Sequence, residues 1–176
     1  MPNIDALLDR NREFASTGGH KAAVLPPRNA VLVITCLDPR VDPSAFLQLD
    51  LADAMVIRNG GGRVTPDVLT NLAFLDQLID TLIPDGGLPL EVAVVHHTGC
   101  GTGYLADPDF RARFADRVGV EQTSLLPLAV TDPAETVRAD VQLIRTGTAK
   151  FPAHWTVSGH VYDLETGLVT TVVPAN

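Results

Sequence analysis

VLVITCLDPR, residues 31–40, is an apolar run that ends in a Cys-x-Asp-x-Arg motif. A second stretch, EVAVVHHTGC at residues 91–100, has the same arrangement, with an apolar run that leads into a His-x-x-Cys motif. Short apolar runs of this kind favour buried strands. The two motifs contain both cysteines of the chain, and each motif follows directly on a predicted strand.

Strand-like and helix-like segments alternate along the chain. Apolar periodicity and turn signals predict helices at residues 4–15, 43–49, 65–83, 109–118 and 132–146, and strands at residues 30–35, 54–58 and 91–95. Residues 157–162 and 168–173 are predicted to form a hairpin, and no element is assigned to residues 119–130. Strands separated by helices imply right-handed crossovers. The expected fold class is therefore α/β, with a mainly parallel β-sheet flanked by helices and a C-terminal β-hairpin.

The length and the net charge of the chain limit the classes of protein to which it can belong. A chain of 176 residues is expected to form one domain, residues 1–176, with a substantial core. The formal net charge of −8 argues against binding to nucleic acid or to an anionic membrane. The apolar runs are too short for a membrane span, and residues 1–10 lack the pattern of a signal peptide. We therefore expect a cytoplasmic protein whose cysteines stay reduced and available to a metal ion.

The cysteines and one histidine have the chemistry of a zinc site. His97 and Cys100 can supply two ligands from one turn after a strand, and Cys36 can supply a third from the end of another strand. In parallel sheets, ligands bind at the carboxyl ends of the strands, where both motifs fall. Three protein ligands leave the fourth position of a tetrahedral zinc ion to water or substrate, which is typical of a catalytic site.

Asp38 and Arg40 add a carboxylate and a guanidinium beside this site. Two thiolates cancel the charge of the ion, so bound water should be less acidic than at a site of three histidines, and activity should favour alkaline pH. Asp38 is the neighbour best placed to accept a hydrogen bond from that water. Arg40 can hold Asp38 ionised and turned away from the metal through a bidentate pair. Without that pair, Asp38 could take the fourth metal position and block the site.

Several of these residues also have simpler interpretations. A buried cysteine is often only a small apolar core residue, but two strand-end motifs that together hold both cysteines favour a metal site. His96 points to the opposite side of its strand from His97, which favours packing or a supporting role. The Gly60–Gly62 run is not spaced like a nucleotide-binding loop and is predicted to be a tight turn beside the site. The interval from Cys36 to Arg40 is too short for a phosphatase-like C-x5-R loop, which disfavours a nucleophilic cysteine.

Together these motifs resemble those of the β-class carbonic anhydrases. The resemblance is carried by CLDPR at residues 36–40, VIRNGG at 56–61, HTGCG at 97–101 and GHVYDLETG at 159–167. It covers most of the chain, and the paired CxDxR and HxxCG motifs are highly specific together. It implies a zinc enzyme, with one Zn²⁺ per subunit, that catalyses the reversible hydration of carbon dioxide to bicarbonate by zinc-bound hydroxide.

Carried over to this sequence, the resemblance implies a set of site residues. The zinc ligands would be Cys36, His97 and Cys100, with Asp38 and Arg40 as the catalytic dyad. Members of the family are built from dimers with the active-site cleft near the subunit interface, so we expect a homodimer or a dimer-based oligomer. Further residues expected to line or brace the cleft are Arg58, Asn59, Gly60, Gly61 and Gly99.

Two positions depart from the common family pattern and leave alternatives open. Gly99 stands where many members carry an acidic or polar residue, and His96 stands where glycine is common. A His-His pair is found in one bacterial branch, which also includes hydrolases of carbonyl sulfide or carbon disulfide. The motifs do not separate these substrates from carbon dioxide, so such a hydrolase is one alternative. The second is a non-catalytic protein that binds zinc or bicarbonate, against which the intact Asp38 and Arg40 pair argues.

Overall fold

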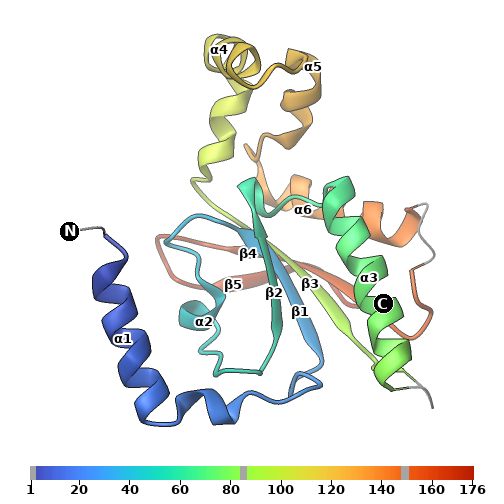
Figure 1. The fold of residues 1–176 in the computed structure, drawn as a ribbon. Coiled ribbons are helices and arrows are strands. Elements are labelled where there is room, and N and C mark those ends of the chain that lie inside the picture. Colours follow the sequence, from blue (N-terminus) through green and yellow to red (C-terminus); the bar gives the residue numbers. More distant parts are fainter. Residues whose placement is uncertain (1–2, 84–86, 148–150) are drawn as a thin grey trace.

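A five-stranded sheet forms the centre of the molecule (Figure 1), in the order β2-β1-β3-β4-β5. The structure is a computed structural model that describes residues 3–83, 87–147 and 151–176. The strands are β1 (Val31–Cys36), β2 (Met55–Asn59), β3 (Glu91–His97), β4 (Thr156–Tyr162) and β5 (Val169–Val173). The first four strands pair in parallel, and β5 pairs antiparallel with β4. The predicted α/β class, with a mainly parallel sheet and a C-terminal hairpin, is confirmed.

Helices surround the sheet and connect its strands. Their bounds are α1 (Asp5–Ser16), α2 (Pro43–Phe46), α3 (Pro66–Leu82), α4 (Pro108–Val118), α5 (Gln122–Leu125) and α6 (Pro133–Thr146). The start of α6 was predicted from Asp132 and Pro133, and the Asp132 carboxylate accepts the backbone N–H groups of Ala134 and Glu135 at 2.9 and 3.0 Å. None of the helices in the described ranges is long and apolar enough to cross a membrane.

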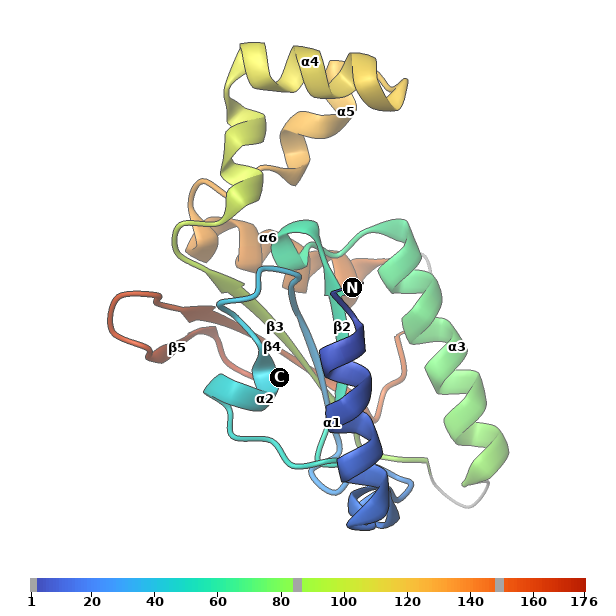
Figure 2. The same cartoon turned by 60° about the vertical axis from the view of Figure 1, so that its left-hand side comes forward.

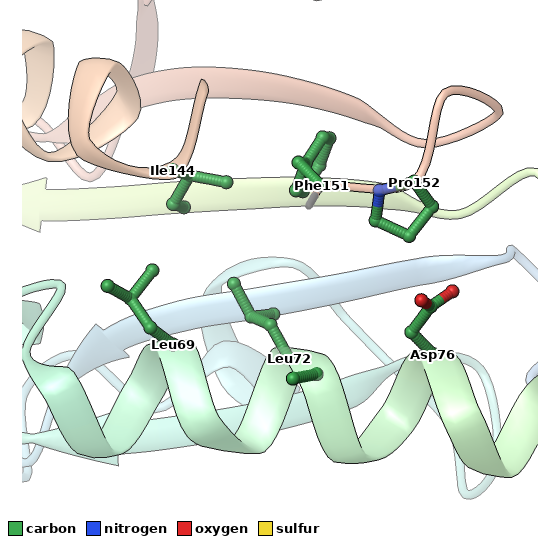
Figure 3. A pocket seen from close by; sticks show the side chains of 7 residues that line it. Leu69, Leu72, Asp76, Ile144, Phe151 and Pro152 are labelled. Atoms are coloured by element: carbon green, nitrogen blue, oxygen red, sulfur yellow. The ribbon is translucent and has the colours of Figure 1, made fainter. Parts of the chain in front are cut away.

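The main core lies between one face of the sheet and the helices α3 and α6. Its buried residues are Leu32 and Ile34 of β1, Val92 and Val94 of β3, Val157 of β4, Val68, Leu72 and Ile79 of α3, and Val137, Val141 and Ile144 of α6. Figure 3 shows side chains of α3 turned toward Ile144 and the segment at Phe151 across a cavity of about 20 Å³, too small for a substrate. This core fixes the positions of the central strands β1 and β3 relative to α3 and α6.

The connection between β3 and α6 differs from the expectation. Residues 119–130, for which no element was predicted, contain the short helix α5 and a 3₁₀ turn at Leu126–Leu128. Together with α4 they project beyond the carboxyl ends of the parallel strands (Figures 1 and 2). A small separate core of Leu105, Ala115, Leu125 and Ala129 holds this projection together. The helix predicted at residues 43–49 is also shorter, since α2 ends at Phe46.

Helix α1 lies along the outside of the molecule (Figure 2), and none of its residues is buried. The apolar side chains Leu7, Leu8 and Phe14 of α1, and Ile4 directly before it, are between 43% and 52% exposed. An isolated helix of this length is only marginally stable in water. The apolar side of α1 therefore lacks the packing that stabilises the other long helices.

Candidate metal centre

The three predicted ligands lie together at the carboxyl edge of the sheet. Cys36 ends β1 and His97 ends β3, and these strands are parallel neighbours, so their last residues meet at one edge. The Sγ atoms of Cys36 and Cys100 are 3.9 Å apart, and one ligand atom from each of the three residues lies within 4.8 Å of the others. Two motifs that are 64 positions apart in the sequence thus form one cluster of donors that could hold a metal ion.

His97 has one unpaired ring nitrogen. Its Nδ1 lies 2.9 Å from the carbonyl oxygen of Thr98, and because a carbonyl can only accept, Nδ1 carries the proton and Nε2 the lone pair. The residue is 1% exposed, and Nε2 is buried without a hydrogen-bond partner among the described residues. A buried acceptor without a partner is unfavourable. A metal ion bound at Nε2 would satisfy it, and a histidine ligand commonly donates its other nitrogen to a carbonyl in this way.

The two cysteine thiols are buried and coupled to each other. The hydrogen bond between the sulfurs, with burial, raises the pKa of the Cys36 thiol, and the same hydrogen bond lowers the pKa of the Cys100 thiol. In the metal-free protein the pair therefore tends to share one proton, and a metal ion would displace it. Two sulfurs and one imidazole nitrogen form a donor set that suits zinc, and three protein donors match a catalytic rather than a closed structural site.

Asp38 and Arg40 form a bidentate ion pair beside the cysteines. The Nε atom of Arg40 donates to Oδ1 of Asp38 at 3.0 Å, and Nη2 donates to Oδ2 at 2.6 Å. These hydrogen bonds hold the pKa of the Asp38 carboxyl well below its usual range. The same Nη2 also donates to the carbonyl oxygen of Gly99 at 3.2 Å. Arg40 thus orients the carboxylate and ties the loop after β1 to the loop after β3.

Arg58 and Asn59 support the site from the neighbouring strand. The guanidinium of Arg58 donates to the carbonyl oxygens of Cys36 at 3.0 Å and Asp38 at 2.8 Å. The amide of Asn59 donates to the carbonyl oxygen of Arg63 at 2.8 Å. Both side chains thus donate to backbone carbonyl oxygens of the loops that surround the site. These contacts are of the kind expected of residues that brace the cleft, rather than of residues that line it.

An open pocket of about 360 Å³ reaches the cysteine cluster. It is lined by Cys36, Leu37, Asp38, Pro39, Gly60, Gly61, Gly101 and Thr102. Gly60 and Gly61 therefore line this pocket. Next to them, Gly62 has a φ of +68°, and a Cβ atom there would lie 2.8 Å from the carbonyl carbon of Thr35 and 2.9 Å from the amide nitrogen of Cys36. Only a glycine lets this predicted tight turn approach the end of β1 so closely.

A buried charged network lies on the other side of this turn. His96 is 0% exposed, and its Nε2 lies 3.2 Å from Oδ2 of Asp140 on α6. Arg63 donates to both oxygens of Asp140, at 2.8 and 2.9 Å. Burial alone would raise the pKa of Asp140, but the hydrogen bonds from His96 and Arg63 hold it below its usual value. The network fixes the segment after Gly62 to α6, so His96 has the supporting position that the strand alternation predicted.

The sequence did not single out Arg63, Asp140 or Thr102. Arg63 and Asp140 are 77 positions apart, and no local motif links them. Thr102 lies two residues after Cys100, and its Oγ1 is 3.2 Å from the Sγ atom of that cysteine. This closeness in the sequence, of a hydroxyl to a candidate metal-binding cysteine, was the one signal that could have pointed to Thr102.

Comparison with known proteins shows which proteins this chain is similar to. The chain is 32% identical over 175 residues to β-carbonic anhydrase 1 of Mycobacterium tuberculosis, covering 99% of this chain and 100% of that protein. It is 26% identical over 186 residues to a carbon disulfide hydrolase of an Acidianus species, covering 93% of this chain and 85% of that one. The crystal structure of a carbonic anhydrase from Streptococcus mutans superposes with a TM-score of 0.78 at 32% identity, covering 98% of each chain.

No protein-family model matches the chain. The full-length relative at 32% identity and the closely similar solved structure nevertheless agree with each other and with the paired strand-end motifs. On this evidence the chain belongs to the β-carbonic anhydrase family.

Proposed function

We propose that this protein is a zinc-dependent carbonic anhydrase that interconverts carbon dioxide and bicarbonate. The observation that carries the proposal is the unpaired, buried Nε2 of His97 beside two thiols and an oriented carboxylate, in a chain of this family. Cys36, His97 and Cys100 would hold one zinc ion per subunit. When bound, zinc would act as a Lewis acid that lowers the pKa of a bound water molecule.

The residues around the ligands would keep the reaction site open and oriented. Arg40 occupies both oxygens of Asp38 from one side, so the ionised carboxylate stays available as a hydrogen-bond acceptor in the pocket. Arg58 fixes the backbone of Cys36 and Asp38 through two hydrogen bonds. This arrangement supports catalysis over a closed binding site, because a structural zinc site needs no oriented carboxylate beside an open position.

The substrate class follows from the pocket and the reaction. Leu37, Pro39 and the two glycines give the pocket apolar walls, which suit a small neutral molecule better than a charged one. Carbon dioxide fits this description. Carbon disulfide and carbonyl sulfide fit it as well, and the similarity to a carbon disulfide hydrolase makes hydrolysis of such a sulfur substrate the second candidate.

We further propose that the chain, a single domain over residues 1–176, works as a homodimer or a dimer-based oligomer in the cytoplasm. The unburied apolar side of α1 supports assembly, since a second copy could cover it. The free thiols of Cys36 and Cys100 suit a reducing compartment. Light scattering coupled to gel filtration tests the assembly, and a monomer at micromolar concentration would contradict it.

Stopped-flow measurement of carbon dioxide hydration on protein of verified zinc content tests the proposed activity. We expect turnover that rises from neutral to alkaline pH in the zinc-loaded protein and disappears after removal of the metal. Zinc-loaded protein without hydration activity at any pH would contradict the proposal. Assays with carbon disulfide and carbonyl sulfide on the same sample then test the second candidate.

A further inference from the structure

We propose that Thr102 is a positioning residue of the metal centre, whose hydroxyl donates a hydrogen bond to the Cys100 thiolate and withdraws charge from it. The inference rests on the proposed zinc site. It assigns to Thr102 the tuning of that site, a role distinct from ligation and from proton transfer.

The geometry defines the direction of this hydrogen bond. Oγ1 of Thr102 lies 3.2 Å from Sγ of Cys100, within hydrogen-bond distance for sulfur. A cysteine that ligates a metal is a thiolate and has no proton to donate. In the metal-loaded protein the hydrogen bond can therefore run only from the Thr102 hydroxyl to the sulfur. A hydrogen bond to an ionised acceptor is stronger than one between neutral groups.

Both sulfurs have backbone hydrogen-bond donors, but they differ in the side chains that contact them. The sulfur of Cys36 accepts the backbone N–H of Asp38 at 3.4 Å. The sulfur of Cys100 accepts a side-chain hydroxyl at 3.2 Å. Apart from the three proposed ligands themselves, Thr102 is the side-chain hydrogen-bond partner that the described residues provide to either sulfur. It is therefore the donor that substitution can remove without changing the backbone.

The glycine turn leaves room for this hydroxyl. Gly61 has a φ of +82°, and a Cβ atom there would lie 3.0 Å from Oγ1 of Thr102. A Cβ atom on Gly60 would lie 3.7 Å from Cγ2 of the same residue. Thr102 thus fills the space beside the two glycines that line the pocket, and this packing restricts where its hydroxyl can point.

A hydrogen bond of this kind would offset part of the effect of two thiolate ligands. Two thiolates neutralise the charge of the ion and weaken it as a Lewis acid. Donation from Thr102 lowers the electron density on one sulfur, so the ion keeps more of its positive character. Without the hydroxyl, Cys100 becomes the more strongly donating ligand, and activation of water should need a higher pH.

Cobalt-substituted protein gives a readout that does not depend on turnover. Thr102→Val removes the hydroxyl at nearly constant volume, Thr102→Ala is a second hydroxyl-free variant, and Thr102→Ser restores the donor. Thr70→Val is the matched control, because Thr70 lies on the exposed side of α3, away from the metal site, and its hydroxyl donates to the carbonyl of Pro66 at 3.0 Å. The thiolate-to-cobalt charge-transfer band of each variant is recorded together with the pH dependence of carbon dioxide hydration.

We expect the charge-transfer band of Thr102→Val and Thr102→Ala to move to longer wavelength, because a thiolate without its hydrogen bond gives up charge more easily. Thr102→Ser and Thr70→Val should match the wild-type band, and the half-maximal pH of hydration should rise only in the hydroxyl-free variants. An unchanged band in both hydroxyl-free variants, or an equal shift in Thr102→Ser, would overturn the role of Thr102. Wild-type protein without any thiolate-to-cobalt band would instead overturn the metal site itself, and this proposal with it.

Discussion

Arg40 meets the carboxylate of Asp38 with two parallel hydrogen bonds, from Nε to Oδ1 at 3.0 Å and from Nη2 to Oδ2 at 2.6 Å. The residues are two positions apart, and the backbone N–H of Arg40 also donates to Oδ1, at 2.9 Å. The carboxylate is therefore held by groups of its own loop before any ligand arrives. Its side chain is 14% exposed, so it borders the pocket without being free to turn in it.

Removal of the guanidinium should release Asp38 toward the metal. In Arg40→Ala we expect a direct bond from Asp38 to zinc in a crystal structure of the loaded protein, and a loss of turnover of roughly 10–100-fold. Arg40→Lys should recover little, because an ammonium group cannot form the bidentate pair. An Arg40→Ala structure with Asp38 in its original place would show that the arginine does not control the carboxylate.

Asp38→Asn should separate metal binding from catalysis. The amide carries no charge and can turn an NH₂ group toward the position where the carboxylate accepts, so we expect stoichiometric zinc with turnover lowered by about 10²–10⁴-fold, the range for loss of a group that assists proton transfer. Zinc content by elemental analysis and stopped-flow hydration on one sample check both parts. Turnover at the wild-type rate would remove Asp38 from the mechanism.

Cys36→Ser and Cys100→Ser should each lose zinc. A hydroxyl is not ionised under these conditions and is a poor replacement for a thiolate ligand. Metal content after dialysis measures the loss, and His20→Ala, which changes an exposed histidine, is the control expected to retain zinc. A serine variant that keeps one zinc ion per chain would refute the ligand assignment for that cysteine.

Asp140→Asn should lower stability rather than alter the metal ligands. Loss of the carboxylate leaves the charge of Arg63 buried with only part of its hydrogen bonding, which costs about 3–5 kcal/mol in the free energy of unfolding. Denaturation in urea measures this difference. Asp116→Asn, on the exposed side of α4, should change stability by less than about 0.5 kcal/mol.

The interactions of Asp140 should also make the free energy of unfolding depend on pH. The pKa of Asp140 is lower in the folded protein than the value of about 3.9 expected in the unfolded chain. Its stabilisation is therefore present above the unfolded-state pKa and is lost as the pH falls through the folded-state pKa. Asp140→Asn should show a smaller loss of stability in acid than the wild-type protein, and equal slopes would contradict this contribution.

The central strands and the ligand cluster could be predicted because their signals are local. Apolar runs with polar residues directly after them define β1 and β3, and parallel pairing then brings Cys36 and His97 to one edge. The antiparallel pairing of β4 with β5 could likewise be predicted, from the turn residues that separate the two strands. Segment 119–130 gave no such signal, because its residues Leu125, Leu128 and Ala129 pack in a small separate core and not against the sheet.

The supporting contacts were not predictable for a different reason. Asp140 was part of a predicted helix, but its burial depends on Arg63, which comes from the turn after β2, and on His96, which comes from β3. Such a network exists only after three elements have been packed together. The backbone partners of Arg58 depend on packing in the same way, since its guanidinium reaches from β2 to the carbonyl oxygens of Cys36 and Asp38 in and after β1.

The placement of the ligands on neighbouring strands has a consequence for the order of assembly. Cys36 comes from β1 and His97 from β3, so a newly made chain has no complete site until these strands are in register. Loading of the proposed metal ion would then be a late event that follows formation of the sheet, unlike the folding of small zinc fingers, in which the ion organises the chain.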